Sequence, residues 1–236
     1  MSKVAVERQG AVWTLRLCRP EVRNAVDVEL SRQLRAAVVE ALEEASAICV
    51  RGEGPVFCSG GDLSSLRDDD TAIAVMDEMR GTLDLLRKAP VPVIAYVEGL
   101  AVGGGAELAA SAHLLCCTPG AAFEFVQAKL HLSPGWGGGP SLLRRVGPGR
   151  ALDLLLSARR VGAAGAEAIG LVDRILTPAQ FTAFLGAAAL QDRELGAAVV
   201  SALRTDEGGP ARAAEQFSAL WRSQSHHEAM RRLRKE

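Results

Sequence analysis

The chain has 236 residues, enough to bury a hydrophobic core without disulfides or metals, and we expect it to form one domain. Its formal net charge is −1 and aromatic residues make up only 4% of it, which disfavours the basic field and base stacking of nucleic-acid binding. Charged residues and glycines interrupt the apolar runs, so we expect no export signal and no membrane span.

The first half of the sequence predicts strands that alternate with helices. Val12–Leu17 has the alternation of a strand, and a helix capped by Asp27 follows to about Ala47. Helical patterns at 72–86 and after Gly103 separate further apolar strands, which we expect at 47–50, 91–97 and 114–117. Strands connected through helices form a mainly parallel sheet, and ligands then bind outside the carboxyl ends of the strands.

The sequence after about Gly149 is mostly helical in pattern, with a short break at 171–175. We expect these late helices to pack on a neighbouring chain. Apolar residues there, which we expect to be partly buried between chains, are Leu152, Leu155, Leu185 and Leu220.

Two glycine clusters lie where strand-like runs end and helical patterns begin, FCSGGDL at 57–63 and VGGGAEL at 102–108. Glycine lets the backbone approach a ligand closely, and the first NH groups of a helix have no partner within it. Two such NH groups converging on one oxygen would stabilise an enolate or a tetrahedral oxyanion. The alternative is that each cluster is an ordinary turn.

Four motifs in order resemble the crotonase, or enoyl-CoA hydratase/isomerase, superfamily of acyl-CoA enzymes. They are LCRPEVRNA at 17–25, the two glycine clusters, and PGWGG at 134–138. The segments at 125–127, 133–138 and 217–221, with Glu228 and Ala229, resemble more narrowly the ethylmalonyl-CoA decarboxylases.

This resemblance implies an α/β fold with a crotonase-like ββα spiral core. Residues 1–148 would form the acyl-CoA-binding core and residues 149–236 a C-terminal helical trimerisation region, within one structural unit. The chain would assemble as a homotrimer or a dimer of trimers, and coenzyme A would enter as part of the substrate, with no separate cofactor.

The resemblance places the thioester oxygen between the backbone NH groups of Gly61 and Gly104, the same two positions that the loop-to-helix pattern leaves without partners. Coenzyme A would be bordered by Ala25, Ser59, Asp62 and Leu63. Arg23 would lie near its phosphates, since a guanidinium can bind phosphate with two hydrogen bonds. An ordinary surface charge is the alternative for Arg23.

Glu107 matches one of the two glutamates with which hydratases of this superfamily handle water and proton. It follows Gly104 by three residues and would overhang the acyl carbons, although a carboxylate there can also simply stabilise the helix start. Gln127 falls where the second glutamate is expected, and an amide cannot act as a general base. A neutral amide can instead donate a hydrogen bond to a substrate carboxylate.

We therefore predict a lyase that decarboxylates an alkylmalonyl-CoA, with the enolate held by the two NH groups. Trp136 would form a dry wall that weakens solvation of the leaving carboxylate, or would serve in core packing alone. The alternatives are an enoyl-CoA hydratase/isomerase and, from another class, a non-catalytic acyl-CoA-binding subunit. A serine peptidase and a nucleotide-binding protein are disfavoured, because neither GxSxG nor GxxxxGK[ST] occurs.

The cysteines, one histidine and the basic tail complete the expectations. Neither a disulfide framework nor a CxxC metal pair fits the cysteines at 18, 49, 58, 116 and 117, so we expect a reducing, cytoplasmic setting and no metal site.

His113 stands where the superfamily usually has an aspartate, and we interpret it as a core histidine with satisfied hydrogen bonds. The basic residues at 231–235 are either a solvated helix end or a contact for a cofactor phosphate.

Overall fold

The computed structural model describes residues 2–189, 192–203 and 209–233. Within them the first half of the chain repeats a strand–strand–helix unit, with the bounds that follow. The units are β1 (Val4–Gln9), β2 (Val12–Leu17) and α1 (Val28–Glu44); β3 (Ala47–Gly52), β4 (Val56–Cys58) and α2 (Asp69–Arg87); β5 (Val93–Val97), β6 (Leu100–Val102) and α3 (Gly104–Ala110); and β7 (Leu114–Cys117), β8 (Ala122–Glu124) and the 3-10 helix η2 (Val126–Leu130). A further 3-10 turn, η1 (Pro20–Val22), lies between β2 and α1.

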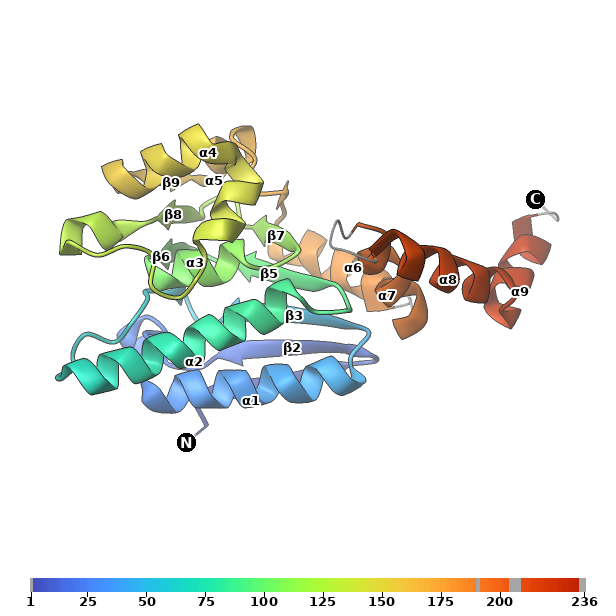
Figure 1. The fold of residues 1–236 in the computed structure, drawn as a ribbon, viewed down its shortest axis with the longest axis horizontal. Coiled ribbons are helices and arrows are strands. Elements are labelled where there is room, and N and C mark those ends of the chain that lie inside the picture. The colour runs from blue at the N-terminus through green and yellow to red at the C-terminus, as the bar shows by residue number, and fades with distance from the viewer. Residues whose placement is uncertain (1, 190–191, 204–208, 234–236) are drawn as a thin grey trace.

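The second half is mostly helical, as the sequence predicts. Its elements are α4 (Gly139–Ser157), β9 (Arg160–Gly162), α5 (Ala163–Ala168), β10 (Arg174–Ile175), α6 (Pro178–Ala189), α7 (Arg193–Ala202), α8 (Gly209–Trp221) and α9 (Gln224–Leu233). The expected boundary after residue 148 falls inside α4, next to Gly147, whose φ of 76° and ψ of 168° interrupt the helix. Helices α8 and α9 extend away from the body of the molecule, at the far end from α3 (Figure 1).

In the described part of the chain the strands form two sheets. The larger has the order β1-β2-β3-β5-β7-β10 and is parallel except for β1 against β2, which confirms the mainly parallel sheet. The smaller has the order β4-β6-β8-β9. Sequence patterns alone missed this second sheet, because each of its strands has three residues and is too short for a period of two to emerge.

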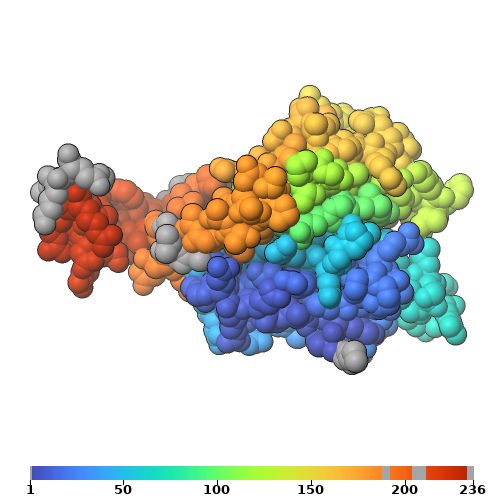
Figure 2. Space-filling model, turned by 180° about the vertical axis from the view of Figure 1, so that it is seen from behind, coloured from blue at the N-terminus to red at the C-terminus, as the bar shows by residue number. Residues whose placement is uncertain are grey.

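Strand β5 shows why the larger sheet is apolar on both faces. Val93, Ala95 and Val97 belong to the main core, while Ile94 and Tyr96 belong to a second cluster with Phe181 of α6. Tyr96 and Phe181 stack with ring centroids 3.8 Å apart and planes 4° from parallel. Helices α1 and α2 lie side by side on the opposite face (Figure 1). Seen from behind, the C-terminal part of the chain projects from one side of the molecule (Figure 2).

Packing within one chain corrects one expectation about the late helices. Leu185 is 5% exposed and lies in the second cluster, so it is buried without a neighbouring chain. Leu155 also packs partly against the main core, whereas Leu152 is exposed. Among the described helices, none combines the length and apolarity that crossing a bilayer requires.

The smaller sheet positions the two glycine clusters. Strands β4 and β6 are parallel neighbours, and a glycine loop follows the carboxyl end of each. The two loops therefore meet at one edge of the sheet, as we predicted for a ligand site.

Candidate active site

The two glycine loops contact each other through their backbones. A Cβ added to Gly60, whose φ is +93°, would lie 3.4 Å from the Gly104 nitrogen. A Cβ added to Gly105 would lie 2.2 Å from the carbonyl oxygen of Cys58. Any side chain at Gly105 would push the start of α3 away from the first loop, so glycine is required there for close approach.

The NH groups of Gly61 and Gly104 have no hydrogen-bond acceptor among the described residues. Their neighbours are bound, since the Asp62 NH donates to Val26 O at 2.9 Å and the Gly103 NH donates to Glu124 O at 2.8 Å. The backbone thus leaves a free donor in each loop at these two glycines, and Gly104 is also the first residue of α3. Two free donors on loops in contact can together receive an oxygen that develops negative charge.

Glu107 lies in the first turn of α3 and is 2% exposed. Its carboxylate accepts hydrogen bonds from the Gly138 NH to Oε2 and from the Gln127 side-chain amide to Oε1, each 2.8 Å long. Burial raises the pKa of Glu107, and these donors offset the rise only in part. The site therefore holds a carboxylic acid that retains its proton to a higher pH than an exposed glutamate does.

Gln127 lies on η2 and is buried against Glu107. One amide hydrogen is used by Glu107, while the amide oxygen is buried without a partner among the described residues. A buried acceptor without a partner is costly unless a ligand or a rearrangement satisfies it. Gln127 therefore has both an unused donor hydrogen and an unused acceptor at the site.

Trp136 and Gly138 complete the wall around Glu107. A Cβ on Gly104 would lie 2.5 Å from the Trp136 ring, so the indole is buried directly against the free NH of the second loop. A Cβ on Gly138 would lie 2.4 Å from Cβ of Glu107. Trp136 is thus packed against the start of α3, whereas sequence reasoning named no function for Gly138.

The segment around Ala25 borders the first glycine loop. The Ser59 NH donates to Arg23 O at 3.0 Å, and the Val26 NH donates to Gly60 O at 2.8 Å. Ala25 is buried, and the side chains of Arg23 and Leu63 are exposed. Ser59 is half-buried between them. The structure therefore brings together all of these residues beside the NH group of Gly61.

Asp62 holds the loop in shape. It is buried, accepts the Ser64 hydroxyl at 2.6 Å, and forms an ion pair with Arg19 at 3.0 Å. Those two contacts hold the pKa of Asp62 below its usual value despite some desolvation. Its carboxylate thus orients the loop, and its bonds within the chain leave it little capacity for a ligand.

Sequence reasoning missed two residues that join the loop to the 19–26 segment. The Arg19 guanidinium donates to Ala25 O at 2.6 Å and to Asp62. Asn24 is fully buried at a φ of 54°, and its amide donates to Glu53 O and Val56 O. Both lie in the 17–25 motif, so the signal was present, but their partners are distant in sequence.

His113 lies on the side of the sheet away from the glycine loops, at the start of β7. Its Nδ1 accepts from the Val93 NH and its Nε2 faces Arg87 O, both at 3.2 Å. Val93 N can only donate and Arg87 O can only accept, so each ring nitrogen faces a backbone group with which it can form a hydrogen bond. This agrees with our interpretation of a histidine whose hydrogen bonds are satisfied.

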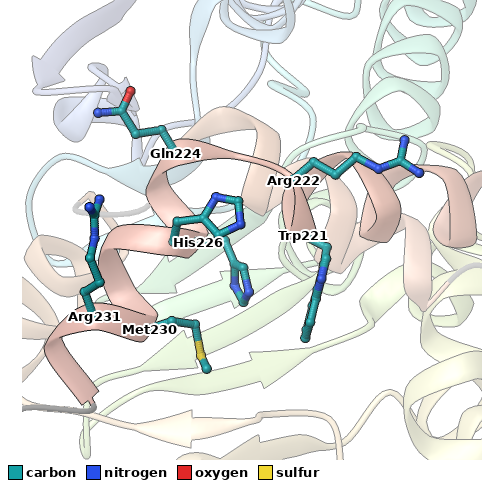
Figure 3. A pocket seen from close by; sticks show the side chains of 7 residues that line it. Trp221, Arg222, Gln224, His226, Met230 and Arg231 are labelled. Carbon is teal, nitrogen blue, oxygen red and sulfur yellow. The ribbon is translucent and has the colours of Figure 1, made fainter.

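A pocket of about 650 Å³ lies between α8 and α9, far from Glu107. Trp221, His226, Met230 and Arg231 are among the side chains that line it (Figure 3). The indole of Trp221 lies 4.5 Å from the ring of His226, measured between centroids. Positions 234 and 235 of the basic tail lie outside the described residues. In a single chain this pocket is separate from the glycine loops.

The chain is similar to known proteins both in sequence and in fold. A family model described as enoyl-CoA hydratase/isomerase matches residues 7–204. A protein of Rhizobium meliloti named "Probable enoyl-CoA hydratase" is 36% identical over 175 residues, 73% of this chain and 68% of that protein. An ethylmalonyl-CoA decarboxylase of Danio rerio is 36% identical over 175 residues, 72% of this chain and 58% of that protein. The crystal structure of an enoyl-CoA hydratase from Thermoplasma volcanium superposes with a TM-score of 0.88 at 26% identity, covering 98% of this chain and 97% of that one.

Proposed function

The chain belongs to the enoyl-CoA hydratase/isomerase, or crotonase, family, and from this premise we propose that it decarboxylates an alkylmalonyl-CoA. The observation that carries the proposal is that a single buried carboxylate at the site is available for proton transfer. Glu107 is the only buried glutamate in the described segments, and the side chain that contacts it, Gln127, is an amide. The buried Asp62 is already paired with Arg19.

The number of protons to be handled separates the candidate reactions. Hydration of an enoyl thioester requires both activation of a water and delivery of a proton, for which hydratases of this family use two glutamates. Decarboxylation breaks one carbon–carbon bond and leaves its electron pair as a thioester enolate, which then needs a single proton at the α carbon. One buried acid is sufficient for that step.

In the proposed reaction the enolate oxygen accepts hydrogen bonds from the NH groups of Gly61 and Gly104. The glycine loops hold these donors in place before the reaction, so that they stabilise the charge as it develops. Glu107, whose pKa is raised by burial, gives its proton to the α carbon and regains one from solvent. Trp136 keeps water from the carboxylate that leaves as CO2.

Gln127 can serve both protonation states of Glu107. When the glutamate is ionised, the amide NH donates to it, as in the observed contact. When the glutamate is protonated, rotation of the amide by half a turn lets the unpartnered oxygen accept that proton in a hydrogen bond. The remaining amide hydrogen is available to the substrate carboxylate, which a second glutamate at this position would repel.

Coenzyme A is proposed to lie along the first loop. Ala25, Ser59 and Leu63 would contact its adenine and pantetheine parts, and the exposed guanidinium of Arg23 would reach its phosphates. Asp62 would contribute by fixing the loop.

The test compares two substrates on the same wild-type preparation. We expect release of CO2 from ethylmalonyl- or methylmalonyl-CoA to be faster than hydration of crotonyl-CoA. Efficient hydration of crotonyl-CoA with no release of CO2 from either malonyl thioester would contradict the proposal.

Hydration is the second candidate. The Rhizobium meliloti relative is named a probable enoyl-CoA hydratase, and Glu107 could activate a water without a second glutamate. The third, a non-catalytic subunit, predicts that acyl-CoAs bind in a titration while no product forms from any of them. Failure of acyl-CoAs to bind at all would contradict all three.

A further inference from the structure

A basic pocket of about 650 Å³ lies past the carboxyl end of α3, on the side of the sheet away from the glycine loops. Its walls come from the end of α2, the turn before β7, α4, the segment before β10, and α7. Among the described residues, four cationic side chains line it, Arg87, Lys88, Arg144 and Arg145, together with the carboxylate of Asp173. Ala89, Val200 and Leu203 supply an apolar wall.

Three of the four cations are engaged within the chain. Arg145 pairs with Asp173 at 2.8 Å and donates to the carbonyl oxygens of Ala110 and Ala112. Arg87 and Lys88 share the carboxylate of Asp84 at the end of α2. Arg145 is thus a structural cap on the turn after α3.

Arg144 differs from the other three. Within the described segments its guanidinium has neither an ion pair nor a hydrogen bond to the protein. Partial desolvation and the charges of Arg145 and Arg87 lower its pKa, which means that its surroundings disfavour the cation. A guanidinium offers several donors in a fixed plane and matches a carboxylate or a phosphoryl group.

We propose that this pocket binds a small organic anion bearing a carboxylate or a phosphoryl group, with Arg144 as its principal contact. Arg87 lines the pocket beside the anionic group, and the wall formed by Ala89, Val200 and Leu203 contacts the apolar body of the ligand. The site is independent of the proposed decarboxylation.

The test is a calorimetric titration of the full chain with two probes, inorganic phosphate and hexanoate. Saturating CoA is present in one series, so that phosphate-binding groups at the acyl-CoA site are already occupied. The variant is Arg144→Gln, and the matched control is Arg150→Gln, an exposed arginine on the same helix outside the pocket. Circular dichroism and thermal unfolding check that both variants fold.

We expect saturable binding of at least one probe, unchanged by CoA and by Arg150→Gln, and weakened about tenfold or more by Arg144→Gln. Tighter binding of hexanoate than of phosphate would show that the apolar wall takes part. No saturable binding of either probe, or equal binding by the two variants, overturns the proposal. It is also overturned if neither probe binds and Arg144→Gln instead weakens self-association in sedimentation, since a carboxylate of a second chain would then occupy the pocket.

Discussion

The carboxylate of Glu107 is the group on which the proposed chemistry depends, so its replacement is the first test at the residue scale. Glu107→Gln keeps the size of the side chain but removes the proton to be delivered. We expect turnover to fall by ~10²- to 10⁴-fold, the usual range for loss of an acid or base. Glu43→Gln, on the exposed side of α1, is the control and should leave turnover unchanged. Unaltered turnover in Glu107→Gln would make Glu107 a structural residue.

Burial of Glu107 also predicts a pH dependence of stability. Because its pKa is raised in the folded state, the folded chain holds a proton that the unfolded chain has lost above its ordinary value of 4.5. The contribution of Glu107 to the free energy of unfolding is therefore greatest below pH 4.5 and is lost as pH rises through the raised pKa.

Urea unfolding of the wild type and of Glu107→Gln at several pH values measures this contribution. We expect the wild type to lose stability relative to the variant as pH rises from about 4.5, and the difference to level off once Glu107 is ionised in both states. The shared carboxylates, including Asp62, cancel in the comparison. A difference independent of pH would contradict the raised pKa.

Gln127 separates the two lyase candidates. Gln127→Glu places a second carboxylate in contact with Glu107, and two charges 4 Å apart repel by about 4 kcal/mol at an effective dielectric constant of 20. The pair would share a proton and titrate as a unit. We expect release of CO2 from ethylmalonyl-CoA to fall by about tenfold or more, and hydration of crotonyl-CoA to rise. Faster decarboxylation in Gln127→Glu would show that the neutral amide is not what the reaction requires.

At the scale of elements, the turn before α4 controls the position of Glu107. Gly138→Ala would place a methyl group 2.4 Å from Cβ of Glu107 and 2.8 Å from its Cα, and those atoms belong to the first turn of α3. Since the backbone there cannot move aside cheaply, we expect turnover to fall by about 10²-fold, in line with displacements of about 1 Å at catalytic groups. Gly139→Ala has nothing within 4 Å of the new methyl group and should retain activity. Equal activity of the two variants would contradict this account.

The elements that the sequence predicted are those long enough to show a period. Helix α1, capped by Asp27 through the Leu30 NH, and the buried strand β5 follow directly from apolar spacing. Strands β4, β6, β8 and β9 do not, because three residues cannot establish a period of two, and tertiary pairing decides their conformation. The resemblance implied the ββα core that local patterns could not supply.

The features of the candidate site also divide into those that the sequence predicts and those that it does not. The free NH groups of Gly61 and Gly104 were predictable, because glycine after a strand and before a helix has a local signature. The bonds from Arg19 to Asp62 and from Asn24 to Val56 were not, since they connect segments more than thirty residues apart. The unpartnered oxygen of Gln127 depends on the packing of η2 against α3, which no sequence pattern contains.

For the whole molecule, the projecting C-terminal helices predict self-association. Phe217 and Trp221 on α8 are 63% and 56% exposed, and their rings contact each other at a tilt of 32° with centroids 5.8 Å apart. Aromatic side chains of this size rarely remain in contact with water when a partner surface can cover them. We propose that they pack on a neighbouring chain in a homotrimer or a dimer of trimers, and sedimentation at micromolar concentration should therefore find assemblies of three or six chains.

The matched variants locate that interface. Replacing both Phe217 and Trp221 with serine removes the exposed aromatic pair while leaving the two hydrophobic clusters of the body intact. We expect this variant to sediment mainly as a monomer with an unchanged thermal transition of the body. Ile73→Ser, which removes an exposed apolar side chain from α2, should assemble like the wild type. If the wild type is strictly monomeric, or if Ile73→Ser dissociates and the aromatic variant does not, then α8 is not the surface through which the chains associate.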